Sequence, residues 1–171
     1  MTEHEIIEAL AAFDRRIAED VAPDALWTAL QDLARQLVGA KLFTVTRVHM
    51  AEGLVRREYT SDPEAYPVSG TKPIHRDRYF EVVHEQHRPF VANTIAEIAT
   101  VFPDHETIAS LGCGSVLNLP AFLGGEIIGT VNCLDVEHHY TPERVERSRH
   151  LALPAKLAFL AADGRARSPG A

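Results

Sequence analysis

Residues 114–135, GSVLNLPAFLGGEIIGTVNCLD, contain two apolar, strand-like runs that join at Leu123-Gly124-Gly125-Glu126. Adjacent glycines adopt positive φ at little steric cost, so the join predicts a tight turn and the two runs predict a β-hairpin. Counting outward from the turn gives the expected cross-strand pairs, which are Phe122 with Ile127, Pro120 with Gly129, Asn118 with Val131, and Val116 with Cys133.

Both faces of this expected hairpin are largely apolar. One face carries Val116, Asn118, Pro120, Phe122, Ile127, Gly129, Val131 and Cys133, and the other carries Leu117, Leu119, Ala121, Ile128, Thr130, Asn132 and Leu134. A hairpin with one face in water would alternate apolar and polar residues, so this hairpin is expected at the centre of a sheet covered on both sides. A β-bulge would shift the register by one residue and exchange the faces.

The same stretch resembles the closing part of a GAF domain. The run SVLNLPAFLGGEIIGTVNCLD is followed by the helix start YTPERVERSRHLALPAKLAFL. In that family a strand with a central proline turns through glycines into an isoleucine-glycine strand, and a C-terminal helix follows. The resemblance covers about residues 20–162 and implies an α+β (α/β) fold. It implies a central antiparallel sheet with the N- and C-terminal helices on one face and a ligand pocket on the other. These motifs are signatures of fold more than of activity.

Length and composition are those of one modest domain. The chain has 171 residues, of which 46% are hydrophobic, and a formal net charge of −7. Such a charge argues against binding to nucleic acid through its phosphates, and no run approaches the ~20 apolar residues of a membrane span. The N-terminus is acidic and amphipathic, unlike a secretory signal, and two cysteines are too few for a disulfide framework. The expected location is therefore the cytoplasm, with neither a nucleic acid nor a membrane as partner.

The first third of the chain predicts two helices and a second hairpin. Apolar residues at helical spacing predict an amphipathic helix over Glu3–Asp20 and another from Pro23 to Gly39, in which Trp27 is expected to be core. The β-branched and aromatic runs Leu42–Met50 and Leu54–Thr60 predict two antiparallel strands.

The middle of the chain is expected to enclose the pocket. Residues 61–73 contain three prolines and a glycine, which predict a structured loop or lid. Asp77 or a neighbouring residue is expected to cap a helix that runs to about Gln86, and Phe90–Ala92 is expected to form a short edge strand. Two short helical segments, 94–99 and 103–111, then precede the central hairpin.

The end of the chain predicts a long helix and a tail. The helix is expected over Thr141–Ala162 with a bend at Pro154, and residues 163–171 have the composition of a flexible tail. The domain plan is thus an N-terminal helix at 1–20 that forms a dimer interface, a GAF domain at 21–162, and the tail. Because the terminal helices carry more apolar surface than one sheet face needs, we expect a homodimer.

Polar side chains in an apolar cavity are the usual form of a small-molecule site. The candidate ligand-binding residues are Tyr59, His75, Tyr79, Asn93, His105, Cys113, Ser115 and Asn118. Each of them could instead be a satisfied polar group of the core or of a loop. Asn118 is the strongest candidate, because an amide in the middle of an apolar sheet is costly unless it finds partners.

No catalytic residue or cofactor is assigned. Cys113 and Cys133 are weak catalytic candidates, since some GAF proteins are free methionine-R-sulfoxide reductases that use cysteines in the pocket. This chain lacks the additional upstream cysteine of that set, and no basic neighbour in sequence would activate either thiol. No metal site is expected either, because the adjacent His138 and His139 diverge, and His84 and His87 lack a further ligand at a metal-binding spacing.

Three functions remain in competition. The leading one is a small-molecule-binding sensory or regulatory domain in signal transduction, with an unknown ligand and a separate protein as signalling output. The second is a thiol-dependent reductase of a small sulfoxide, and the third is a dimerisation module whose pocket is filled by side chains. The chain matches neither the cyclic-nucleotide signature nor the chromophore-cysteine motif of other GAF domains.

Overall fold

The computed structural model describes residues 1–68 and 70–166, which contain a six-stranded sheet. Its strands are β1 (Leu42–His49), β2 (Leu54–Thr60), β3 (Thr71–Pro73), β4 (Phe90–Ala92), β5 (Ser115–Leu123) and β6 (Glu126–Asp135). The strand order is β3-β2-β1-β6-β5-β4 and every neighbouring pair is antiparallel. The predicted hairpin β5–β6 lies inside this sheet, and the predicted edge strand Phe90–Ala92 lies at its edge.

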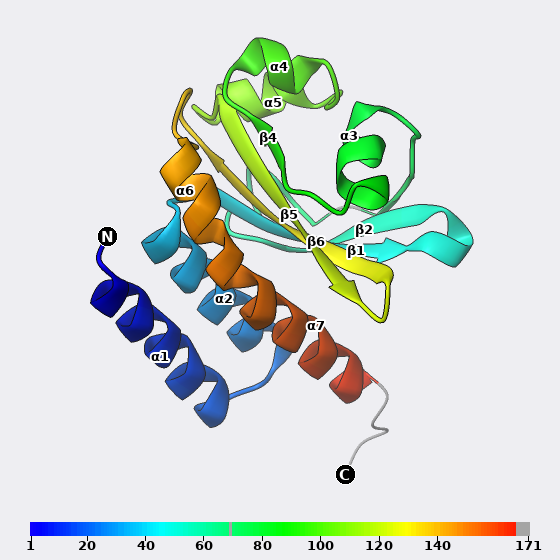
Figure 1. The fold of residues 1–171 in the computed structure, drawn as a ribbon. Coiled ribbons are helices and arrows are strands. Elements are labelled where there is room, and N and C mark those ends of the chain that lie inside the picture. The colour runs from blue at the N-terminus through cyan, green and yellow to red at the C-terminus, as the bar shows by residue number, and fades with distance from the viewer. Residues whose placement is uncertain (69, 167–171) are drawn as a thin grey trace.

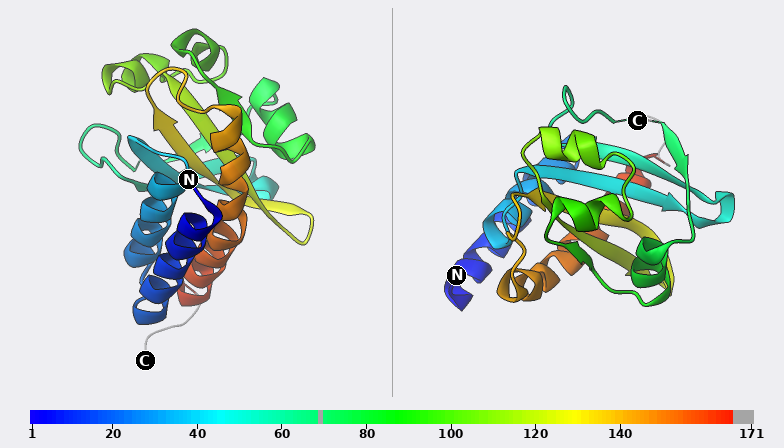
Figure 2. Two further views of the ribbon diagram at one scale, coloured as in Figure 1. Left: turned by 60° about the vertical axis from the view of Figure 1, so that its left-hand side comes forward. Right: turned by 90° about the horizontal axis from the view of Figure 1, so that it is seen from above.

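Helices cover both faces of the sheet (Figure 1). One face carries α1 (Glu3–Glu19), α2 (Pro23–Leu37), α6 (Pro142–Arg147) and α7 (Ala152–Ala166), and the other carries the short helices α3 (Arg78–Phe80), α4 (Ile95–Ala99) and α5 (His105–Ser110). Two further views show the terminal helices as one layer on the side of the sheet away from α3, α4 and α5 (Figure 2). This arrangement confirms the predicted α+β fold, with an antiparallel sheet and terminal helices on one face. None of the helices in the described part is long and apolar enough to cross a membrane.

Each layer of helices encloses its own core. The terminal helices pack on the sheet through a cluster that includes Trp27, Phe43 and Phe159, which are at most 2% exposed. Trp27 is therefore a core residue, as predicted. A second cluster, which includes Val83, Ile98 and Ile108, lies beneath the short helices on the opposite face.

A bulge corrects the predicted register of the central hairpin. Phe122 pairs with Ile127 as expected, but the register shifts between Ala121 and Phe122 because Ile128 has no partner. The other three predicted pairs are wrong, since Pro120 pairs with Thr130, Asn118 with Asn132, and Val116 with Leu134. The faces of β6 are thereby exchanged.

Three further elements differ from their predictions. Strand β3 lies in the stretch expected to be a loop and pairs with β2 at the sheet edge. The C-terminal helix is interrupted by the 3₁₀ turn η3 (Ser148–Leu151), one turn before Pro154, which cannot donate a hydrogen bond to the preceding turn. Helix α7 continues to Ala166, past residue 163, and residues 167–171 of the expected tail lie outside the described residues.

Candidate functional site

A cavity of about 300 Å³ lies between the sheet and the middle segment of the chain. Its floor is formed by β1, β5 and β6, and its walls by β2, residues 72–84 and residues 102–108. The short helices pack on the sheet through an apolar cluster that includes Ile98 and Ile108, and the cavity lies above the central strands. The pocket is therefore open, not filled by side chains.

The floor carries a chain of hydrogen bonds between polar side chains. Asn118 and Asn132 are directly opposed on β5 and β6, and Asn118 Nδ2 donates to Asn132 Oδ1 at 2.6 Å. Asn132 Nδ2 in turn donates to the hydroxyls of Thr44 and Thr46 on β1, both at 3.1 Å. Both amide side chains are about 5% exposed, so these bonds offset much of the cost of burying them.

The chain of hydrogen bonds leaves one acceptor unused. Asn118 Oδ1 is buried and has no hydrogen-bond partner. Two other buried side-chain atoms in the described residues share this property, His84 Nδ1 and Arg57 Nε. All three residues line the cavity, so the unsatisfied buried groups of the described part are gathered at this site.

Aromatic rings form the wall above the floor. Tyr79 meets Phe102 edge-on with ring centroids 5.4 Å apart, and His84 stacks on Phe80 at 4.6 Å. Burial raises the pKa of Tyr79 and lowers the pKa of His84, although the nearby Asp77 carboxylate opposes the second shift. Both side chains are therefore uncharged at neutral pH.

Charged side chains of the lining neutralise one another. The Arg57 guanidinium lies over the ring of Tyr66 at 3.8 Å and donates to the Pro67 carbonyl at 2.8 Å. Asp104 accepts a 2.6 Å hydrogen bond from the Tyr66 hydroxyl and lies about 4 Å from the cationic nitrogens of both Arg57 and Lys72. Asp77 caps the next helix, as predicted, by accepting from the Phe80 amide at 3.0 Å.

No family model matches the chain, and the curated proteins contain no detectable sequence relative. Solved structures do match. The GAF domain of a two-component sensor histidine kinase from Bacillus halodurans aligns with a TM-score of 0.69 at 10% identity, over 86% of this chain and all of that one. The GAF domain of a phosphoenolpyruvate-protein phosphotransferase from Coxiella burnetii aligns with a TM-score of 0.65 at 17% identity, over 96% of this chain and 99% of that one.

This chain has the GAF-domain fold. A free methionine-R-sulfoxide reductase from Neisseria meningitidis, solved in complex with its substrate, has the same arrangement. It aligns with a TM-score of 0.67 at 15% identity over 96% of this chain and 95% of that one. At such identities the likeness concerns the fold alone.

Three of the predicted ligand-binding residues line the cavity of this GAF fold, namely His75, Tyr79 and Asn118. The other five were predicted to line the cavity but lie outside its lining, which corrects the prediction for Tyr59, Asn93, His105, Cys113 and Ser115.

Four of those five side chains are engaged within the fold. Tyr59 donates to Gln31 Oε1 at 2.8 Å on the side of the terminal helices, and Asn93 makes two 3.1 Å hydrogen bonds to the backbone of Tyr140. Ser115 donates to the Val136 carbonyl at 2.7 Å, and His105 Nδ1 lies 3.1 Å from the Phe102 carbonyl.

Sequence reasoning missed most of the polar floor. Thr44, Thr46, Thr130 and Asn132 line the cavity, but the unbulged register placed Thr130 and Asn132 on the opposite face. Thr44 and Thr46 are two residues apart on β1, so they lie on the same face of the strand. This spacing is the sequence signal that could have identified them as part of one polar face.

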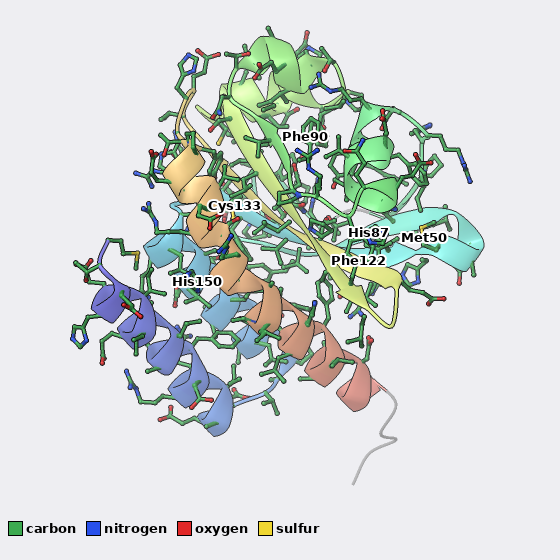
Figure 3. All side chains as sticks on the ribbon, in the orientation of Figure 1. Met50, His87, Phe90, Phe122, Cys133 and His150 are labelled. Carbon is green, nitrogen blue, oxygen red and sulfur yellow. The ribbon has the colours of Figure 1, made fainter. Side chains whose placement is uncertain are left out.

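The two thiols lie on opposite sides of the sheet. Cys133 belongs to the core beneath the terminal helices (Figure 3), whereas Cys113 packs in the cluster beneath the short helices and does not line the cavity. Both are free and at most 4% exposed. Burial raises the pKa of Cys133 to about 12 and also raises that of Cys113, so both are protonated thiols at neutral pH.

Proposed function

We propose that the chain is a small-molecule-binding domain of sensory or regulatory type and that the cavity is its binding site. The observation that carries this proposal is the gathering of buried, unpartnered polar atoms at the cavity. A buried donor or acceptor without a hydrogen-bond partner destabilises the fold by about 1–3 kcal/mol. Because these groups are gathered at one place, we expect a ligand to supply their missing hydrogen bonds. The cavity volume of about 300 Å³ lies at the lower end of the usual range for such sites.

Two features favour binding over thiol chemistry. The lining contains no cysteine, and burial keeps both thiols protonated. A thiol-dependent reductase needs a thiolate within reach of its substrate. A sensory role in signal transduction is part of this proposal, and the GAF domain of a sensor histidine kinase shares the fold.

Native mass spectrometry of the freshly purified protein tests the proposal. We expect an adduct of small mass that disappears under denaturing conditions. Val55→Phe should abolish the adduct, because Val55 is half-buried in the cavity wall and a ring there would occupy the space. Val136→Phe is the matched control, since Val136 is 51% exposed and lies outside the lining. An adduct that survives Val55→Phe would place the ligand elsewhere, and the absence of any adduct or ligand-induced stabilisation would contradict the proposal.

We also propose that the chain forms a homodimer through its terminal helices. Leu153, Leu157 and Leu160 are 77%, 47% and 46% exposed and follow one another along α7 at helical spacing. Ile7 on α1, within the segment expected at the interface, is 54% exposed. Apolar patches of this kind on a monomer are typical of interaction sites.

A further inference from the structure

We propose that the cavity binds an uncharged, planar molecule with an amide-type edge, in which an N–H donor stands beside a carbonyl acceptor. This inference rests on the proposed function and adds the chemical class of the ligand. It is carried by the hydrogen-bond capacity that the floor leaves unused, by the pairing of the charges in the lining, and by the aromatic wall.

The floor presents an amide edge of its own. Asn132 uses both hydrogens of Nδ2 on Thr44 and Thr46, so it has none left to give to Asn118 Oδ1. Asn118 spends one Nδ2 hydrogen on Asn132 Oδ1 at 2.6 Å, and an amide nitrogen carries two. Asn118 therefore keeps one acceptor oxygen and one N–H hydrogen that no other described side chain uses, and an amide edge, with one donor and one acceptor, is a complement of that unused capacity.

The lining favours a neutral ligand. The five polar residues of the floor, which are Thr44, Thr46, Asn118, Thr130 and Asn132, are all uncharged. Off the floor, Arg57 and Lys72 share Asp104 as their counter-charge, Arg57 keeps one Nε–H without a partner, and Asp77 is used as a helix cap. An ionised group brought to this floor would lose its hydration and would find no opposite charge there to replace it.

The wall favours a flat ligand body. Tyr79, Phe80, His84 and Phe102 line the space above the floor and pack against one another, with His84 stacked on Phe80 and Tyr79 edge-on to Phe102. Aromatic rings bury large apolar areas and pack best against other rings in stacked or edge-on geometry. A planar ring that carries the amide edge would satisfy wall and floor together.

Benzamide, benzoate and benzamidinium test this class, because they share one shape and differ in charge and hydrogen-bond pattern. Dissociation constants are measured for all three by ligand-observed NMR titration. We expect benzamide to bind wild type at least about tenfold more tightly than either ion. Asn118→Leu should weaken benzamide by about 5- to 150-fold while the circular dichroism spectrum stays unchanged.

Asn118→Asp provides a gain of binding that a merely unfolded variant could not produce. The new carboxylate has two acceptor oxygens and a negative charge, so the preference should shift from benzamide to benzamidinium. The Asn132 amide can rotate so that Nδ2 donates to the new carboxylate. Its Oδ1 would then accept from the hydroxyls of Thr44 and Thr46, which can donate as well as accept.

The outcomes separate this inference from the proposed function. Tighter binding of benzoate or benzamidinium to wild type, or benzamide binding that Asn118→Leu leaves unchanged, would overturn the amide class. If none of the three probes binds while an adduct sensitive to Val55→Phe is present, the amide class fails and the cavity stands as a binding site. If both probes and adduct are absent, both proposals fail.

Discussion

Burial makes the Cys133 thiol unreactive, and its rate of chemical labelling tests this. Because burial raises the pKa of Cys133 to about 12, only about one molecule in ten thousand carries that thiolate at pH 8. We expect 5,5′-dithiobis(2-nitrobenzoate) to react with native Cys133 at least a hundredfold more slowly than with the protein unfolded in guanidinium chloride. Cys113→Ser isolates the signal of Cys133, and rapid labelling of that native variant would contradict the buried assignment.

The same burial argues against redox turnover. Neither Cys113→Ser nor Cys133→Ser should change the reduction of free methionine sulfoxide coupled to thioredoxin and NADPH, because the expected rate is already that of the background reaction. Robust wild-type turnover that either substitution abolishes would overturn the binding proposal in favour of a reductase.

Asn118 and Asn132 show how far the site could be predicted from sequence. Asn118 stands out because it interrupts an apolar strand, and its place at the cavity follows from counting along β5. Asn132 is equally central, but its face depends on whether Ile128 is paired or bulged. That choice is made by packing across the sheet, so a pattern read along one strand does not determine it.

At the scale of elements, the contact between α7 and β6 depends on Gly129. A methyl group at position 129 would lie 2.6 Å from the Thr46 carbonyl oxygen and would collide with the ring of Phe159. We expect Gly129→Ala to lower the free energy of unfolding by about 1–3 kcal/mol, as overpacking does in other cores. Urea denaturation measures this change.

Gly164→Ala in α7 is the matched control, because a methyl group there would meet no side chain, and no backbone outside its own helix, within 4 Å. It should be neutral or slightly stabilising, since alanine favours a helix more than glycine does. Equal effects of the two substitutions would refute the close approach of α7 and β6.

The elements that the sequence predicted well are those with a strong local signal. Helices α1 and α2 and the strands β1 and β2 lie within one or two residues of their expected bounds. Strand β3 lacks such a signal, because its three residues are all exposed and are ordered by pairing with β2. Sequence periodicity reports burial, and an edge strand with little burial leaves no periodic pattern to detect.

For the whole molecule, buried acids with raised pKa values predict alkaline sensitivity. Burial raises the pKa of Cys133 from 9.0 to about 12 and also raises those of Tyr66, Tyr79 and Tyr140. The folded state holds these protons where the unfolded state releases them, so their stabilisation is complete below about pH 9 and is lost as the pH rises toward 12.

Each such group should lower the free energy of unfolding by up to about 1.4 kcal/mol per pH unit in that range. Urea denaturation at pH 8, 9.5 and 11 measures the slope. Cys133→Ser should give a shallower slope because serine does not titrate, whatever its effect on stability at pH 8. A pH-independent midpoint between pH 9 and 11 would contradict the buried, protonated state of these groups.

The exposed apolar side chains of the terminal helices predict a homodimer. Stable interfaces bury about 800 Å² on each partner, and the exposed leucines of α7 give an apolar centre for such a contact. Leu157→Glu would place a charge in that centre, and in a two-fold dimer that charge would occur in both copies of the interface. We expect sedimentation velocity at about 50 μM to give a dimer for wild type and a monomer for Leu157→Glu.

Leu123→Glu is the control and should remain dimeric, because Leu123 is similarly exposed, at 43%, but stands at the hairpin turn of β5. A monomeric wild type at this concentration would remove the dimer, and the exposed leucines would then need another partner to explain them.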